Sequence, residues 1–272
     1  MPPNALTKAF AAHQPAFGVW LTSPGFFHAR TVAQSSPHVS WVLIDCAQGL
    51  ASGITALPES IAAVHGTDGP SALVRIPPSN TSWEIKQALD AGARGVLVPL
   101  VSTAEDARDI VVASCSTLRD TLGRGALSPD HPVTVLLAQI ETRQGVANAK
   151  DIAEVDGIDV LFIGPYDLSI ALGYPVPSPD PHPEVEKIIQ GIRQAAHRAG
   201  KKCAIYCASG AQAAWRAAEG FDMINVTSDM GAMASGIVDH LSVAVAAGGG
   251  GELKGWCKEK DVMPCQFGLS YP

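Results

Sequence analysis

Eight short apolar segments recur along the chain, each rich in β-branched or aromatic residues. Between them, stretches such as SWEIKQALDAG at 82–92 repeat Ile, Leu and Ala at helical spacing and end in Gly. Near-continuous apolar segments are typical of strands covered on both faces, as in a parallel sheet. The expected strands are FGVWL at 17, WVLID at 41, ALVRI at 72, GVLVPL at 95, VTVLLAQI at 133, DVLFI at 159, KCAIY at 202 and DMINV at 222. This alternation predicts an α/β protein with a single-domain (β/α)₈ TIM barrel.

A doubly wound open sheet would show the same alternation of strands and helices. Such a sheet usually carries a Gly-rich phosphate loop after its first strand, whereas this chain continues into WLTSPGFF and contains no GxGxxG or GxxxxGK[ST] motif. The pattern therefore favours the barrel. We expect it to span residues 1–247, with a tail at 248–272 that follows a glycine hinge at 248–251.

Composition narrows the classes of partner. With 272 residues, of which 47% are hydrophobic, the chain can bury one large core. Its net charge of -7 argues against a nucleic-acid partner. No apolar run approaches the roughly 18 to 20 residues that span a bilayer, and the start MPPNALTKAF lacks the core of a secretory signal. We expect a cytoplasmic protein without a membrane partner, whose six scattered cysteines are reduced.

Polar side chains stand where the expected strands end, and a (β/α)₈ barrel carries its active site at that edge. Glu141 and Asp167 follow the fifth and sixth strands, which lie about 5 Å apart. Two carboxylates so close repel each other unless a cation lies between them, and oxygen ligands favour Mg²⁺ or Mn²⁺. Alternatively, either acid caps the helix that follows it.

Arg75 ends an otherwise apolar strand, so its guanidinium needs an anion. That anion is either structural, such as Asp45 or Glu141, or it belongs to a substrate. A 2-oxo acid would satisfy both the arginine and a nearby metal ion. Gly164 and Pro165 in IGPYD indicate close approach of the backbone to a ligand or a simple turn.

Several motifs at these strand exits occur together: IDCxxG, LVRIP, ALDAGARGVLVPLV, AQIET, VDGIDVLFIGPYDLS and GKKCAIYCASG. In this order they resemble the HpcH/HpaI family of metal-dependent class II aldolases, which act on pyruvate-derived 2-oxo acids, and the resemblance covers about residues 17–245. It implies a hexameric enzyme whose last helix packs on a neighbouring subunit.

The resemblance also implies roles for individual residues. Glu141 and Asp167 match the metal ligands, and Arg75 matches the arginine that grips the 2-oxo acid. Asp90 matches an acid associated with the family's catalytic histidine, and Asp45 matches the aspartate of the second-strand motif. The expected substrate-binding positions are Arg75, Gln139, the backbone of Gly164, Pro165 and Tyr166, and Tyr206 at the seventh strand exit.

The chain departs from the family where D-x-E-H-G is usual, because it reads Asp45-Cys46-Ala47-Gln48-Gly49. The missing histidine is the family's proton shuttle, and the missing glutamate supports metal-bound waters. Gln48 can hold a water or a carbonyl oxygen in that catalytic position, but it cannot accept a proton near pH 7. Retro-aldol cleavage, which removes a proton from a substrate hydroxyl, should therefore be impaired.

A second departure is the short Gly/Pro-rich link at 120–132, where the family carries a longer segment over the pocket. A wider mouth is expected. The candidates for a replacement proton carrier are His28, Tyr206 and Cys207, whereas His182, His197, His13 and His240 are expected at the surface or near the chain ends.

The sequence therefore predicts a metal-dependent carbon–carbon lyase that forms a pyruvate-type enolate, either as an aldolase or as an oxaloacetate-type decarboxylase. Decarboxylation breaks its bond without a base that takes a hydroxyl proton, so it tolerates the loss of the histidine. The alternative is a family member that has lost the aldolase reaction and serves as a ligand-binding protein or in a different, ring-forming step.

Overall fold

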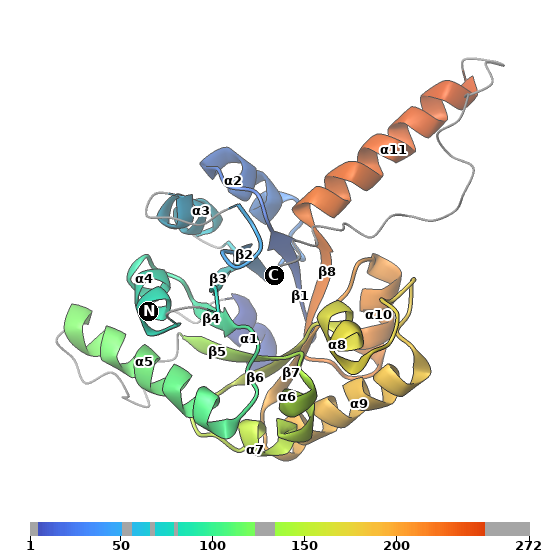
Figure 1. Ribbon diagram of the computed structural model, residues 1–272. Helices are drawn as coiled ribbons and strands as arrows, with labels where there is room; N and C mark the ends of the chain where they lie inside the picture. The colour runs from blue at the N-terminus through green and yellow to red at the C-terminus, as the bar shows by residue number, and fades with distance from the viewer. Residues whose placement is uncertain (1–4, 51–55, 66–68, 79–80, 123–133, 248–272) are drawn as a thin grey trace, which may run out of the picture. The chain divides into compact units, whose positions relative to one another are not determined.

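The computed structural model describes residues 5–50, 56–65, 69–78, 81–122 and 134–247. Eight parallel strands pair in chain order and the first also pairs with the last, so the sheet closes into a barrel (Figure 1). The expected (β/α)₈ barrel is confirmed. The strands are β1 (Ala16–Leu21), β2 (Trp41–Asp45), β3 (Ser71–Arg75), β4 (Gly95–Val98), β5 (Val135–Ile140), β6 (Val160–Ile163), β7 (Lys202–Tyr206) and β8 (Met223–Ser228).

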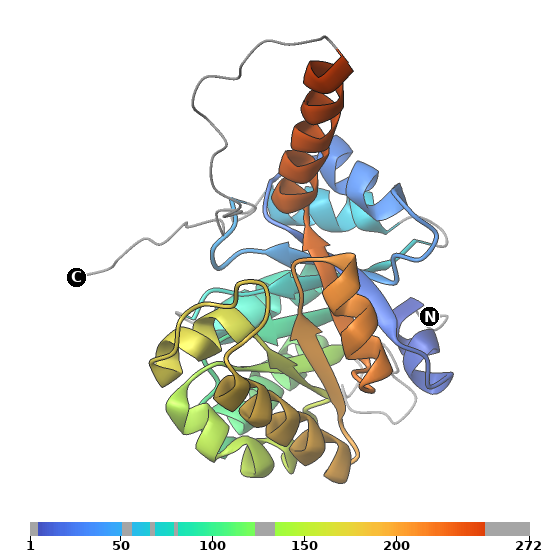
Figure 2. The same ribbon diagram turned by 90° about the vertical axis from the view of Figure 1, so that its right-hand side faces the viewer.

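Helices alternate with the strands along the chain. They are α1 (Ala5–Ala11), α2 (Phe26–Gln34), α3 (Ala56–Val64), α4 (Thr81–Asp90), α5 (Ala104–Leu122), α6 (Arg143–Ala147), α7 (Ala149–Ala153), α8 (Pro165–Leu172), α9 (Pro183–Arg198), α10 (Gly210–Ala218) and α11 (Asp229–Ala247). Helices α2 to α10 lie outside the ring of strands (Figures 1 and 2). Contacts divide the chain into a barrel unit, Met1–Asp229, and a second unit, Met230–Pro272, whose described part is helical. None of the described helices has the length and hydropathy needed to cross a membrane.

The amino-terminal end of the barrel is filled. Trp41 lies buried inside it, where a Cβ atom on Gly18 would overlap the indole ring, and its Nε1–H donates to the Ala16 carbonyl at 3.0 Å. Helix α1 places Leu6 in the same apolar cluster, and the Leu6 amide donates to Ser71 Oγ at the start of β3. Figure 2 shows α1 at the opposite end of the barrel from α8. Apolar side chains therefore fill this end of the barrel, whereas the buried Asp45, Arg75, Gln139 and Glu141 lie toward the carboxyl ends of the strands.

Strand register sets the level of the polar residues at that end. Asp45 lies directly opposite Arg75 on β2 and β3. Ile140 lies opposite Ile163 on β5 and β6, so the residues that follow them, Glu141 and Gly164, leave the sheet side by side. Cross-strand neighbours in a sheet lie about 5 Å apart, which brings these groups within reach of one another.

Two expectations concern the irregular segments. Helix α5 continues to Leu122, so the first three residues of the expected link at 120–132 are helical. The rest of this link, and the expected tail at 248–272, lie outside the described residues.

Candidate active site

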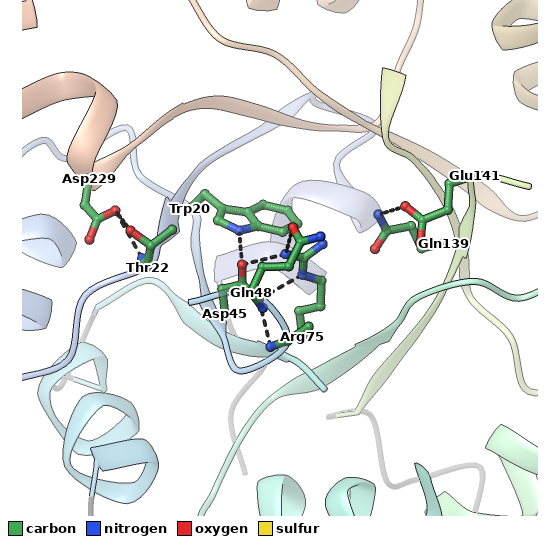
Figure 3. Close-up of polar contacts among 9 residues, drawn as sticks. Trp20, Thr22, Asp45, Gln48, Arg75, Gln139, Glu141 and Asp229 are labelled. Atoms are coloured by element: carbon green, nitrogen blue, oxygen red, sulfur yellow. Dashed lines mark hydrogen bonds and ion pairs between the residues drawn. The ribbon is translucent and has the colours of Figure 1, made fainter. Parts of the chain in front are cut away.

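Arg75 and Asp45 form a buried ion pair at the carboxyl end of the barrel (Figure 3). The guanidinium donates from Nε to Asp45 Oδ1 at 2.9 Å and from Nη2 to Asp45 Oδ2 at 2.6 Å. Burial alone would raise the pKa of Asp45, but the charge and hydrogen bonds of Arg75 outweigh it and hold the pKa below its usual value. The structural anion that the sequence left open is therefore Asp45.

Asp45 also organises the loop that follows β2. Its Oδ1 accepts hydrogen bonds from the backbone N–H groups of Ala47 and Gln48, at 3.0 and 3.2 Å. With Arg75 and Trp20 included, each oxygen of this carboxylate accepts at least two hydrogen bonds, and its pKa is lowered. In this arrangement Asp45 positions Arg75 and the loop and is a poor proton acceptor.

Trp20 completes this cluster and was not among the residues expected from the sequence. Its Nε1–H donates to Asp45 Oδ2 at 3.1 Å, and the Arg75 guanidinium lies 4.9 Å from the centre of its ring. An indole N–H inside an apolar strand needs a partner, so the position of Trp20 near the end of FGVWL was the available signal.

Gln48 lies against the arginine. Its Oε1 accepts from Arg75 Nη2 at 2.9 Å, while the residue itself is exposed at the mouth of the site (Figure 3). The amide orientation follows from chemistry, because a guanidinium only donates hydrogen bonds and the amide oxygen must face it.

Gln139 lies on β5, and Glu141 directly follows this strand. In Figure 3 both lie across the strand ends from Arg75. Glu141 Oε1 accepts from the Leu100 amide at 2.9 Å, and its Oε2 accepts from Gln139 Nε2 at 2.5 Å. Each carboxylate oxygen thus accepts a hydrogen bond, and Glu141 also lies within hydrogen-bonding reach of Asp167. Leu100 adopts a left-handed backbone conformation, with φ of 59°, which sequence reasoning did not anticipate.

Glu141, Asp167 and Gln139 converge on Gly164. A Cβ atom built on Gly164 would lie 3.1 Å from Gln139 Nε2, 3.4 Å from Glu141 Oε2 and 4.0 Å from Asp167 Oδ2. The absence of a side chain at Gly164 therefore leaves a small space lined by two carboxylates. The sequence prediction that these two acids approach each other is consistent with this geometry.

The electrostatics of this space suit a cation. Burial and the charge of Asp167 raise the pKa of Glu141 to about 7, against smaller opposing effects of the Leu100 amide and Arg75. Gln139 Oε1 is buried without a hydrogen-bond partner among the described residues. Two uncompensated carboxylates and an orphaned acceptor fit a hard divalent ion completed by water or substrate oxygens. Among the described residues, no group of three or more His, Cys, Asp or Glu side chains is arranged to hold a metal ion.

The other expected residues lie at varied distances from this centre. Tyr166 and Tyr206 are half-buried and contact each other edge to face, and Tyr206 also contacts Trp20. Asp90 is not brought to the site within this chain. It ends α4, which runs back toward the amino-terminal end of the barrel, and its partner is Lys86 at 3.3 Å.

Two of the candidates for a replacement proton carrier, Cys207 and His28, have buried or charged surroundings. Burial raises the pKa of the Cys207 thiol to about 12. His28 Nε2 lies 2.9 Å from Asp229 Oδ2, and Asp229 also accepts from Thr22 at the end of β1. Figure 3 shows Asp229 and Thr22 on the side of Trp20 away from Glu141. Asp229 was overlooked in the sequence, although it is an acid at a strand exit.

A family model described as HpcH/HpaI aldolase/citrate lyase matches residues 18–235. The chain belongs to this family. The family match is consistent with the barrel and with the position of the acid pair after β5 and β6. Members of the family that are similar to this chain are named aldolases, and the protein is accordingly an enzyme of the carbon–carbon lyase type.

Three similar proteins illustrate the relationship. A hydroxypyruvate/pyruvate aldolase of Rhizorhabdus wittichii is 35% identical over 238 residues, covering 84% of this chain and 93% of the relative. A 4-hydroxy-2-oxo-heptane-1,7-dioate aldolase of Salmonella arizonae is 34% identical over 224 residues, covering 77% and 82%. The crystal structure of macrophomate synthase superposes with a TM-score of 0.73 at 25% identity and covers 90% of each chain.

Proposed function

We propose that the protein is a divalent-metal-dependent carbon–carbon lyase that cleaves a 2-oxo acid through a pyruvate-type enolate. The observation that carries the proposal is the convergence of Glu141 Oε2 and Asp167 Oδ2 on the space beside Gly164. The relatives named as aldolases of pyruvate, hydroxypyruvate and a 2-oxo dioate support the same class of substrate.

In this proposal Glu141 and Asp167 hold Mg²⁺ or Mn²⁺, whose charge stabilises the negative charge that develops on the enolate. Arg75 donates to an anionic oxygen of the substrate, since Asp45 engages only its Nε and Nη2. The first turn of α8, which begins at Pro165, presents backbone N–H groups to a carboxylate. Gln139 and Tyr206 line the same space. By family resemblance we further propose a homo-hexameric, cytoplasmic enzyme.

Two reactions share this enolate. In decarboxylation of a 2-oxo diacid, the bond to the departing carboxylate breaks, its electron pair forms the enolate, CO₂ leaves and water returns a proton. In aldol cleavage, a base must first remove the proton of the 4-hydroxyl group. Gln48 stands in place of the family's histidine, and no described side chain near it is a competent base: Asp45 is saturated and the pKa of Cys46 is raised to about 12 by burial.

Metal titration tests the acid pair directly. Isothermal titration with Mn²⁺ or Mg²⁺ should show one site per chain in the wild type and none in Glu141→Ala or Asp167→Ala. Glu154→Ala is a matched control, because Glu154 is an exposed acid that pairs only loosely with Lys150, at 3.8 Å. Unchanged binding in the two site variants would exclude the metal hypothesis.

Turnover is tested separately with oxaloacetate and with a 4-hydroxy-2-oxo acid, each beside a metal-only control because free metal also decarboxylates oxaloacetate. We expect pyruvate release above that control, lost in Glu141→Ala and retained in Glu154→Ala. Binding of pyruvate without turnover of either substrate would instead support the alternative, a family member that binds its ligand without the lyase reaction.

A further inference from the structure

The amide of Gln48 has a fixed direction. Arg75 Nη2 can only donate, so Oε1 of Gln48 faces the guanidinium at 2.9 Å and Nε2 is directed away from it. Among the described residues, no acceptor engages Gln48 Nε2. Because Gln48 is exposed at the mouth of the site while Arg75 is buried, this amide presents an N–H donor to the space in which a substrate would lie.

The Nη1 group of Arg75 is a second hydrogen-bond donor beside Gln48. Asp45 takes Nε and one hydrogen of Nη2, and Gln48 takes the other hydrogen of Nη2. None of the described residues accepts from Nη1. Since Nη1 and Nη2 share one edge of the planar guanidinium, an oxygen placed beside Gln48 Oε1 can accept from Nη1–H, and the amide group of Gln48 that carries Nε2–H borders the same position. Trp20 covers the face of the same guanidinium and limits its movement.

From this arrangement we propose that Gln48 is a substrate-contacting residue: its Oε1 holds Arg75 in place, and its Nε2 donates, together with Arg75 Nη1, to a carboxylate or keto oxygen of the bound 2-oxo acid. The inference rests on the proposed function for the ligand class. It gives Gln48 the role of an oxygen-binding donor in a position where the family uses a proton acceptor.

Two substitutions separate the two parts of the proposed role of Gln48, which are support of Arg75 by Oε1 and donation to the substrate by Nε2. Gln48→Glu retains an oxygen that can accept from Arg75 but has no N–H, whereas Gln48→Met has a similar length and neither group. Leu50→Glu is the matched control for added charge, because Leu50 lies exposed on the same loop, with 77% of its surface accessible. Gln48 is exposed, so we expect all three variants to fold, which thermal unfolding checks.

The measurement is isothermal titration of the Mn²⁺-loaded protein with pyruvate and with oxalate, a non-reacting analogue of the enolate. We expect Kd to rise about tenfold or more in both Gln48→Glu and Gln48→Met, the loss typical of a hydrogen bond to a charged group, and to stay near the wild-type value in Leu50→Glu. Adding 2-oxoglutarate locates the acceptor: a loss confined to it places the contact on a second carboxylate, and an equal loss places it on the pyruvate moiety.

Wild-type affinity in Gln48→Glu with a loss only in Gln48→Met would overturn the donor role and leave Gln48 as a support for Arg75. Wild-type affinity of both variants for pyruvate, oxalate and 2-oxoglutarate would overturn the inference entirely. Failure of the proposed function has a different signature, because the wild-type protein itself would then bind neither Mn²⁺ nor a 2-oxo acid.

Discussion

Arg75 and Gln48 illustrate how a single replacement changes what a side chain can do without removing it from a site. The amide cannot titrate near neutral pH, yet its oxygen is firmly engaged by a buried guanidinium. Asp45 accepts from the backbone of Ala47 and Gln48, so the start of this loop is held by hydrogen bonds, while an amide at position 48 cannot move a proton. At the residue scale, our proposal is that this chain keeps the family's binding groups and lacks its base.

Restoring the family residues tests this account. The double substitution Ala47→Glu and Gln48→His should raise aldol cleavage of a 4-hydroxy-2-oxo acid, by about 10²-fold or more if the imidazole acts as a general base. The gain should grow as pH rises through about 6.5, where the imidazole becomes neutral. The measurement is kcat/KM against pH, with Gln48→Asn as the control that introduces no base. If cleavage does not increase, the defect lies elsewhere in the pocket.

At the scale of elements, the junction between β6 and α8 places a glycine where the acid pair meets. Helix α8 begins at Pro165 directly after the strand, which suits proline because the first helical N–H has no partner in the helix. Gly164 is thus held at the level of Glu141 by the strand register. The space that our proposal assigns to an ion depends on this position having no side chain.

Gly164→Ala should therefore impair Mn²⁺ binding and turnover more than stability. The added methyl group would lie 3.1 Å from Gln139 Nε2 and 3.4 Å from Glu141 Oε2, so these side chains must shift. We expect Kd for Mn²⁺ to rise by about tenfold, a cost of roughly 1.4 kcal/mol. Gly191→Ala in α9 is the control, because nothing lies within 4 Å of its Cβ position and stability should rise by about 0.5 to 1 kcal/mol. Unaltered Mn²⁺ affinity in Gly164→Ala would contradict the assigned site.

The strands could be predicted from sequence because each is an uninterrupted apolar segment buried on both faces, as VLFI in β6 shows. Strand order then located Glu141 and Asp167 near each other. The pairing of Arg75 with Asp45 was left open, because Asp45, Glu141 and a substrate carboxylate are all chemically suitable anions for a buried arginine. The hydrogen bond from the Leu100 backbone N–H to Glu141 could not be predicted, because any residue type at position 100 offers the same backbone N–H.

At the scale of the whole molecule, buried carboxylates make stability depend on pH. The pKa values of Asp45, Asp222 and Asp229 are lowered: burial acts to raise each of them, but neighbouring cations and hydrogen-bond donors outweigh it. A depressed folded pKa contributes stability that is present above the unfolded value of about 3.9 and is lost as pH falls through the folded value. The unfolded chain binds more protons in that range, so acid favours unfolding.

We therefore expect the free energy of unfolding to fall steeply below about pH 4. Asp45→Asn should lower the free energy of unfolding at pH 7 by about 3 to 5 kcal/mol, the usual cost of leaving one member of a buried ion pair without its partner. It should also make the free energy of unfolding less dependent on pH in acid. Urea unfolding followed by circular dichroism at pH 3 to 8 measures both effects. Asp90→Asn, which removes an exposed pair with Lys86, should cost less than about 1 kcal/mol. Equal losses in the two variants would contradict this assignment of the buried pair.

The floor formed by Trp41, Gly18 and α1 has a kinetic consequence. Because the described side chains fill the amino-terminal end of the barrel, substrate and product would both use its carboxyl-terminal end. If the proposed function holds, pyruvate occupies the site that its precursor needs and should inhibit the reaction competitively.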